Sequence, residues 1–255
     1  MNMANALSIV VENITFQSDG HDLHGRIYRP ASEGQYPAIV ICHGYPGDIK
    51  NMDLAEESAF HGIVALIFYY QGAWGSKGVY RIINLEPSTK DAVKYLKSLT
   101  YIDPKRVGLV SHSLGSIPVV KLLSRDKTIK TSALLAPLTD VSFWTFGDWL
   151  DINVPHFIES AKGKLEGISS NQIREDLNKI ALSDNPINLV TQIKTPTLLV
   201  VGSEDDVVPA ELCRLFYDKL QNTKKWQLID GADHTFSEHR LPMIRIVLDW
   251  FKLTI

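Results

Sequence analysis

The chain has 255 residues, of which 45% are hydrophobic and 22% charged, and these values are typical of one large globular α/β domain spanning residues 1–255. The formal net charge of −3, without a run of basic residues, argues against nucleic acid as a partner. No apolar stretch approaches the roughly 20 residues of a membrane helix, and Met1–Ala6 lack the pattern of a secretory signal. With two distant cysteines, Cys42 and Cys213, these features predict a cytoplasmic protein with no membrane partner.

The first elements predicted are two strands joined by a tight turn. Residues 10–16 and 23–28 alternate between apolar and polar side chains, and Asp19-Gly20 lies between them. This pattern predicts an antiparallel hairpin. From residue 38 the pattern changes to short, continuously apolar runs, as expected for strands covered on both faces. They occupy residues 38–42, 63–69, 107–111, 133–136, 197–201 and, more weakly, 226–229.

Segments with helical spacing alternate with these strands, at residues 85–99, 117–123, 210–220 and 243–251. Alternation of this kind predicts a mostly parallel sheet of about eight strands with right-handed crossovers. We therefore expect a three-layer α/β/α sandwich with the hairpin at one edge of its sheet.

One connection is far longer than an ordinary loop between a strand and a helix. Residues 138–193 contain a cluster of aromatic side chains and a charged helical stretch at 172–180, the aromatic residues being Phe143, Trp144, Phe146, Trp149 and Phe157. We predict that this segment forms a helical cap over the carboxyl edge of the sheet, with aromatic residues lining an apolar acyl or aryl pocket. The alternative is a peripheral insertion whose aromatic side chains pack on one another.

The apolar run at 107–111 leads into Ser111-His112-Ser113-Leu114-Gly115, a small-x-Ser-x-Gly turn followed by helix-compatible residues. Such a turn reverses a strand sharply and leaves one hydroxyl at its tip. The following helix would direct free backbone N–H groups towards developing negative charge. A serine hydroxyl is a weak nucleophile until a base takes its proton. For His112, beside Ser113, we expect a supporting role.

An acid and a base follow at the ends of later strands. Asp205 and Asp206 lie in the turn after the strand at 197–201, and His234 lies between the last strand and the last helix. Because the carboxyl ends of parallel strands meet at one edge, His234 could accept the proton of Ser113. A carboxylate could hold the imidazole in position, and at this point either aspartate could supply it.

These three segments, together with His43-Gly44-Tyr45-Pro46-Gly47 after the first parallel strand, resemble the α/β-hydrolase superfamily, in particular its serine esterase and acylaminoacyl-peptidase-like branches. The resemblance implies Ser113 as nucleophile, His234 as base and Asp205 as acid, since the family spacing from Gly202 favours Asp205. It also implies an oxyanion hole made by the backbone N–H groups of Tyr45 and Leu114. Ser111 departs from the pattern, because the family usually has glycine there, and we expect the turn to tolerate it.

The resemblance implies hydrolysis of a carboxylic ester or related acyl compound through an acyl-Ser113 intermediate. The expected partner is a small-molecule acyl ester or a short peptide, with no cofactor and no metal; a homo-oligomer is compatible with the sequence. One alternative is an acylaminoacyl peptidase or exopeptidase, which needs charged groups to hold a peptide terminus, the candidates being Asp148, Asp151, Glu159 and Glu166. Another is a hydrolase-like protein that binds ligands without catalysis.

Overall fold

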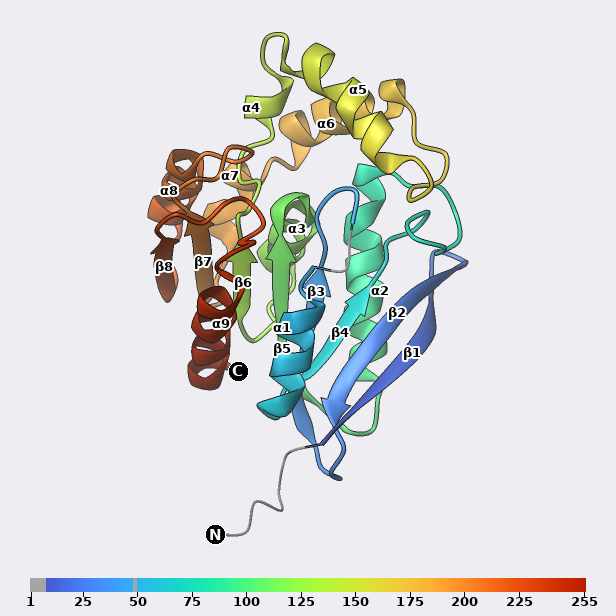
Figure 1. The fold of residues 1–255 in the computed structure, drawn as a ribbon, viewed down its shortest axis with the longest axis vertical. Helices are drawn as coiled ribbons and strands as arrows, with labels where there is room; N and C mark the ends of the chain where they lie inside the picture. Colours follow the sequence, from blue (N-terminus) through green and yellow to red (C-terminus); the bar gives the residue numbers. More distant parts are fainter. Residues whose placement is uncertain (1–7, 48–49) are drawn as a thin grey trace.

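The computed structural model describes residues 8–47 and 50–255. This part of the chain forms one eight-stranded sheet with helices on both faces (Figure 1). Met1–Ala6, which bear on the prediction about a secretory signal, lie outside the described residues. No helix within the described ranges is long and apolar enough to cross a membrane.

The hairpin predicted near the N-terminus is confirmed. Strands β1 (Ile9–Ser18) and β2 (His21–Pro30) pair antiparallel along their whole length. Asp19 and Gly20 both adopt positive φ angles, of 48° and 76°, as the tight turns that suit the twist of a hairpin require. β2 also pairs antiparallel with β4 (Val64–Phe68), so the hairpin forms one edge of the sheet.

The rest of the sheet is parallel, and its strand order is β1-β2-β4-β3-β5-β6-β7-β8. The remaining strands are β3 (Tyr36–Cys42), β5 (Ile102–His112), β6 (Ser132–Leu135), β7 (Thr197–Gly202) and β8 (Lys224–Ile229). Every residue of β4, β6 and β7 is buried, which explains why their sequences are continuously apolar. The predicted fold, a mostly parallel α/β/α sandwich, is therefore confirmed.

Two apolar cores lie on opposite faces of the sheet. Along β3, Val40 and Cys42 belong to one core, and Ile39 and Ile41 belong to the other, because successive side chains of a strand point to opposite faces. The first core is covered by α2 (Leu85–Lys97), α3 (Ser116–Arg125) and α8 (Ala210–Lys219). The second is covered by α1 (Met52–Phe60) and α9 (Arg240–Thr254).

Helix α1 was not predicted from the sequence. Its buried residues are Leu54, Ala55, Ser58 and Ala59, three of which are small. Small side chains give a weak periodic signal, so an amphipathic pattern is hard to see in this segment. The helix nevertheless packs closely on the sheet, beside α9, because these residues occupy little space.

The long connection between β6 and β7 is mainly helical. It contains α4 (Ser142–Thr145), α5 (Trp149–Ala161), α6 (Ser170–Ser183), α7 (Pro186–Leu189) and the 3₁₀ turn η3 (Val190–Gln192). Figure 1 shows α4, α5 and α6 beyond the carboxyl ends of the parallel strands, at the top of the view. The segment that the sequence assigned to a cap therefore lies over the edge where the candidate site was expected.

An ion pair with a buried carboxylate fastens this segment to the loop that precedes α2. The Arg81 Nε donates to both carboxylate oxygens of Asp176 in α6, at 3.1 and 3.0 Å, and the backbone N–H of Ile82 donates to the same carboxylate at 2.9 Å. The Asp176 side chain is only 2% exposed. A paired charge with several donors can be buried at acceptable cost, so α6 is held at a fixed place beside the 3₁₀ turn η1 (Ile82–Asn84) and α2.

Candidate active site

Ser113 lies where β5 ends, as the first residue of the 3₁₀ turn η2 (Ser113–Gly115) that leads into α3. Its φ angle is 53°, a left-handed conformation that is uncommon for residues other than glycine and often found at functional sites. A Cβ on Gly115 would lie 2.6 Å from the carbonyl oxygens of Cys42 and His43. The turn can pass so close to the end of β3 only because residue 115 has no side chain.

The turn forms with serine at position 111, where the family usually has glycine. Ser111 is fully buried and is paired with Cys42 on β3 and Leu134 on β6. Its hydroxyl has no hydrogen-bond partner within the described part of the chain. A buried hydroxyl without a partner costs free energy, so the substitution is accommodated in shape but carries an energetic penalty.

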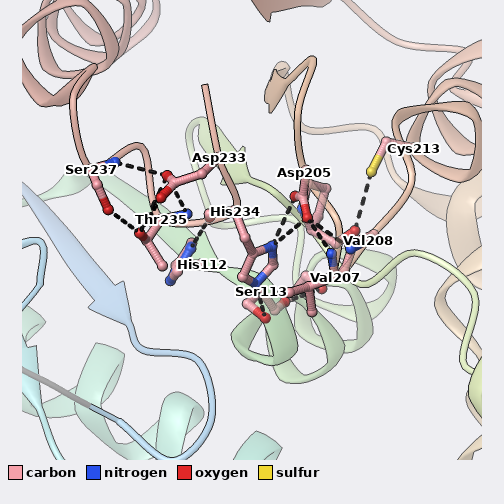
Figure 2. Close-up of polar contacts among 12 residues, drawn as sticks. His112, Ser113, Asp205, Val207, Val208, Cys213, Asp233, His234, Thr235 and Ser237 are labelled. Atoms are coloured by element: carbon pink, nitrogen blue, oxygen red, sulfur yellow. Dashed lines mark hydrogen bonds and ion pairs between the residues drawn. The ribbon is translucent and has the colours of Figure 1, made fainter. Parts of the chain in front are cut away.

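His234 connects Ser113 with Asp205 (Figure 2). Its Nε2 lies 2.8 Å from Ser113 Oγ, and its Nδ1 lies 2.8 and 3.0 Å from the two carboxylate oxygens of Asp205. Because a carboxylate only accepts hydrogen bonds, the Nδ1–H donates to Asp205 and Nε2 is left to accept the Ser113 hydroxyl proton. The Asp205 side chain is 0% exposed and that of His234 is 12% exposed, so this hydrogen-bonded series is largely screened from water.

Asp205 is fixed by the backbone that follows it. The N–H groups of Val207 and Val208 donate to its Oδ1 at 2.9 and 2.8 Å (Figure 2). These bonds turn the carboxylate towards His234, whereas Asp206 is exposed. Of the two carboxylates that the sequence left open, Asp205 is the one that contacts the imidazole.

The loop that carries His234 has its own internal bonds. The Asp233 carboxylate accepts the backbone N–H groups of Ser237 at 2.8 Å and Thr235 at 3.1 Å (Figure 2). Burial alone would raise the pKa of Asp233, but the hydrogen bonds from Ser237 and Thr235 hold it below the usual value. Arg240, to which the sequence assigned no role, donates to the Thr235 carbonyl at 3.2 Å. The loop is thus well ordered independently of its contact with Ser113.

The loop after β3 runs directly against the serine turn. A Cβ on Gly44 would lie 3.0 Å from the Ser113 Cβ and 3.2 Å from the His112 carbonyl oxygen. Tyr45 follows Gly44, and Leu114, which is 0% exposed, follows Ser113. Both residues predicted to supply oxyanion N–H groups therefore belong to segments adjacent to the Ser113 side chain.

Tyr45 also links this loop to the helices above it. Its hydroxyl donates to the Phe157 carbonyl in α5 at 2.8 Å, and its ring lies 4.6 Å from the Phe157 ring between centroids. Burial raises the pKa of Tyr45, which keeps the phenol protonated as a donor. Nothing in the sequence around residue 45 signals this contact, because it joins residues 112 positions apart.

Tyr45 and three aromatic residues of the connection form a continuous row, which we call the aromatic wall: Tyr45, Phe157, Trp149 and Trp144. The two tryptophan rings stack at 4.8 Å, and both meet Phe157 edge-on at 5.8 and 5.9 Å. The other two aromatic residues expected to line a pocket differ, since Phe143 is 44% and Phe146 86% exposed. Of the five aromatic residues predicted to line a pocket, Trp144, Trp149 and Phe157 thus pack on one another, and Phe143 and Phe146 are exposed.

The described residues around Ser113 do not form a metal site. Within residues 8–47 and 50–255, no group of three or more His, Cys, Asp or Glu side chains could hold a metal ion. The arrangement can instead move a proton from a serine hydroxyl to an imidazole beside a buried carboxylate, next to a helix start whose N–H groups favour negative charge.

Comparisons with known proteins agree with this fold. Over 90% of its length the chain is 24% identical to an uncharacterized protein of Mycobacterium tuberculosis, of which it covers 73%. Over half of its length it is 30% identical to the quorum-quenching protein AidA of Acinetobacter baumannii, of which it covers 44%. Est1E of Butyrivibrio proteoclasticus, solved with ferulic acid bound, superposes with a TM-score of 0.72 at 20% identity, covering 93% of this chain and 97% of Est1E.

The family is given by a match to the model of the prolyl oligopeptidase family, which spans residues 88–255. That range contains the turn of Ser113, the turn of Asp205 and the loop of His234. The chain is therefore an α/β hydrolase that belongs to the prolyl oligopeptidase family.

Proposed function

We propose that this protein hydrolyses carboxylic esters through an acyl-enzyme intermediate on Ser113. The observation that carries the proposal is the hydrogen-bonded series from Ser113 Oγ through the His234 imidazole to the Asp205 carboxylate. A serine held in a strained turn at the end of a strand, with a base and an acid in series, is the arrangement that activates a hydroxyl for acyl transfer.

In the first step the Ser113 Oγ attacks the ester carbonyl carbon while His234 Nε2 takes the hydroxyl proton. The tetrahedral intermediate then collapses, and the imidazolium gives that proton to the leaving alcohol, so that an acyl-Ser113 ester remains. A water molecule repeats the sequence, losing its proton to His234, and releases the carboxylic acid. Asp205 keeps the imidazole in the tautomer that this requires and stabilises its positive charge.

The negative charge that develops on the carbonyl oxygen needs donors beside Ser113. We assign this role to the backbone N–H groups of Tyr45 and Leu114, since the close approach of Gly44 to Ser113 brings the two segments together. Loss of one such donor typically costs about 10²–10³ in rate. Because the donors are main-chain groups, side-chain replacement at either residue leaves them chemically present.

The aromatic wall supports an apolar or aryl acyl group as the preferred substrate. Tyr45 follows Gly44, which lies beside Ser113, and its ring contacts Phe157, which in turn meets Trp149; Trp144, only 2% exposed, packs behind Trp149. Flat apolar surfaces of this kind bind aromatic and aliphatic groups through burial and ring contacts. The structural likeness to Est1E, whose solved complex contains ferulic acid, is consistent with an aryl-containing acyl group.

A peptidase is the second candidate, and the family match favours it. Holding a charged peptide terminus would require an unpaired carboxylate facing the site. The four acidic residues that the sequence suggested for this role, Asp148, Asp151, Glu159 and Glu166, are all exposed, and two of them pair with neighbouring cations, namely Asp151 with Arg174 and Glu159 with Lys162. Esters need no such group, and on this ground we place ester hydrolysis first.

Two measurements test the proposal together. A fluorophosphonate probe should label the wild-type chain on Ser113 and should not label Ser113→Ala, whereas Ser98→Ala, at an exposed serine, should label normally. Nitrophenyl esters of increasing acyl length should be turned over faster than aminoacyl nitroanilides. Faster cleavage of the anilides would replace the esterase assignment by the peptidase, and absence of any adduct would leave a protein that binds ligands without catalysis.

A further inference from the structure

His112 stands between the serine turn and the histidine loop. It is the last residue of β5, directly before Ser113, and it is only 9% exposed. Its Nε2 lies 2.9 Å from the backbone carbonyl oxygen of His234, a residue 122 positions away in the sequence (Figure 2). Because a carbonyl oxygen can only accept a hydrogen bond, His112 Nε2 carries the proton and donates it.

The imidazole of His112 is neutral under ordinary conditions. Burial, followed by the nearby His234, lowers the pKa of His112 from 6.5 to about 3, and the positive charges of Arg240 and Lys50 act in the same direction. A neutral ring with Nε2 protonated has an unprotonated Nδ1. That Nδ1 lies 3.6 Å from the position that a Cβ on Gly44 would take, so the ring also fills the space beside the loop that precedes Tyr45.

These contacts place His112 against three segments on which the proposed reaction depends: the nucleophile, the base and the oxyanion loop. We infer that His112 is a positioning residue, whose Nε2–H holds the backbone of His234 at the height that keeps the imidazole within reach of Ser113 Oγ. The inference rests on the proposed function, because it concerns the same proton transfer. His112 itself exchanges no proton with the substrate.

The role is specific because other bonds already hold the rest of the loop. Asp233 accepts the N–H groups of Thr235 and Ser237, the Glu204 N–H donates to the Ala232 carbonyl at 3.0 Å, and Arg240 holds the Thr235 carbonyl. Loss of the His112 donor would therefore leave the loop folded and free only the backbone at His234. A shift of about 1 Å between a base and its nucleophile can cost about 10²-fold in rate.

Three variants separate a hydrogen-bond donor from a space-filling side chain. Gln places its amide nitrogen the same number of bonds from Cα as His Nε2, whereas Asn places it one bond closer and Leu has no donor. With a nitrophenyl ester as substrate, we expect kcat of His112→Leu and His112→Asn to fall about 10–100-fold with KM changed less than about twofold. His112→Gln should stay within about threefold of the wild type.

The control is His61→Leu, directly after α1, which removes an exposed histidine and should leave kcat and KM unchanged. Thermal unfolding of each variant shows whether it folds. If His112→Leu does not fold, the kcat values of His112→Gln and His112→Asn alone test the need for a donor at Nε2. Equal kcat for wild type, Leu and Asn, or a Gln variant as slow as Leu, overturns the inference. If the wild-type chain shows no Ser113-dependent hydrolysis, the proposed function is overturned. If the wild type is active and His112→Asn is equally active, this inference alone is overturned.

Discussion

The edge of the sheet that carries Ser113 and the helical connection above it are held together in different ways. At the edge, backbone passes against backbone: Gly44 against the serine turn, Gly115 against the end of β3, and Gly202 so close to Ala232 that a Cβ there would lie 2.2 Å from the Ala232 carbonyl oxygen. In the connection side chains do more of the holding, chiefly the Arg81–Asp176 pair and the aromatic wall, beside one short stretch where residues 164–166 bond through their backbone to residues 72–80.

The two regions should tolerate amino-acid substitutions to different degrees. Contacts between backbones allow almost no variation, since even one methyl group would displace a segment. Contacts between side chains can be exchanged one at a time at a cost of a few kcal/mol each. We therefore expect substitutions at the sheet edge to affect the reaction itself, and substitutions in the connection to affect stability and substrate preference.

The largest effect predicted lies at the sheet edge. Ser113→Ala should lower kcat for a nitrophenyl ester by about 10³–10⁶-fold, since the nucleophile is lost while the oxyanion donors and binding surface remain. Thermal unfolding should be nearly unchanged, because one hydroxyl is removed from a site that is already formed. Activity close to that of the wild type would show that the nucleophile is another residue.

In the connection, the ion pair of Asp176 should have the largest effect on stability. Asp176→Ala leaves the Ile82 N–H without its acceptor and the partly exposed Arg81 guanidinium with only Glu175 at 3.9 Å, and should lower the free energy of unfolding by about 2 kcal/mol. Asp151→Ala breaks the pair with Arg174, in which the Asp151 side chain is 72% exposed, and should change it by less than about 0.5 kcal/mol. Denaturant unfolding measures the change in unfolding free energy for both variants. Equal changes would contradict the prediction that the Asp176 pair stabilises the chain more than the Asp151 pair.

The pH dependence of stability should report the buried imidazole at the sheet edge. The pKa of His112 is about 3 in the folded chain, against 6.5 for an ordinary histidine. Between these values the unfolded chain binds a proton at His112 that the folded chain excludes. The contribution of His112 to stability is therefore fully present above pH 6.5 and is lost as the pH decreases. At about 1.4 kcal/mol per pH unit, the loss between pH 6.5 and 4.5 is about 2–3 kcal/mol.

Replacing His112 by Gln should remove this contribution. Groups other than residue 112 titrate equally in both chains, so the difference between unfolding free energies at pH 7 and pH 4.5 should be smaller in His112→Gln by that amount. An identical acid dependence in the two chains would mean that the imidazole is accessible to protons in the folded state.

The smallest effect predicted concerns Ser111. Ser111→Ala removes a buried hydroxyl that has no partner within the described residues, and should raise the free energy of unfolding by about 1 kcal/mol. The matched control is Ser132→Ala, since the hydroxyl of Ser132 donates to Thr197 Oγ1 at 3.0 Å. That substitution should lower stability by a similar amount, and destabilisation by both would indicate a partner for Ser111.

Most of the sheet could be predicted because local patterns reflect it. Continuously apolar runs indicate strands buried on both faces, and Asp19-Gly20 supplies the positive φ angles of a hairpin turn. The order of Ser113, Asp205 and His234 along the chain, each after a strand, was enough to expect them at one edge. All three lie together in the structure.

Other features of the site depend on the direction in which each side chain points, and a sequence pattern does not contain this information. Asp205 and Asp206 are chemically identical neighbours, so residue type alone left both open, and only the family spacing from Gly202 favoured Asp205, which contacts His234. Phe146 and Trp144 are equally apolar, yet one is 86% and the other 2% exposed. The bond from Tyr45 to the Phe157 carbonyl joins segments far apart in the chain, so no local signal could have revealed it.

The central claim is that acyl groups pass through Ser113. It is tested most directly by quenching the enzyme in acid during turnover of a hindered nitrophenyl ester, whose acyl group leaves the enzyme slowly, and mapping the added mass by mass spectrometry. We expect one acyl group on the peptide that contains Ser113, and none in Ser113→Ala. Acylation of a different residue, or continued hydrolysis with no acyl group on Ser113, would contradict it.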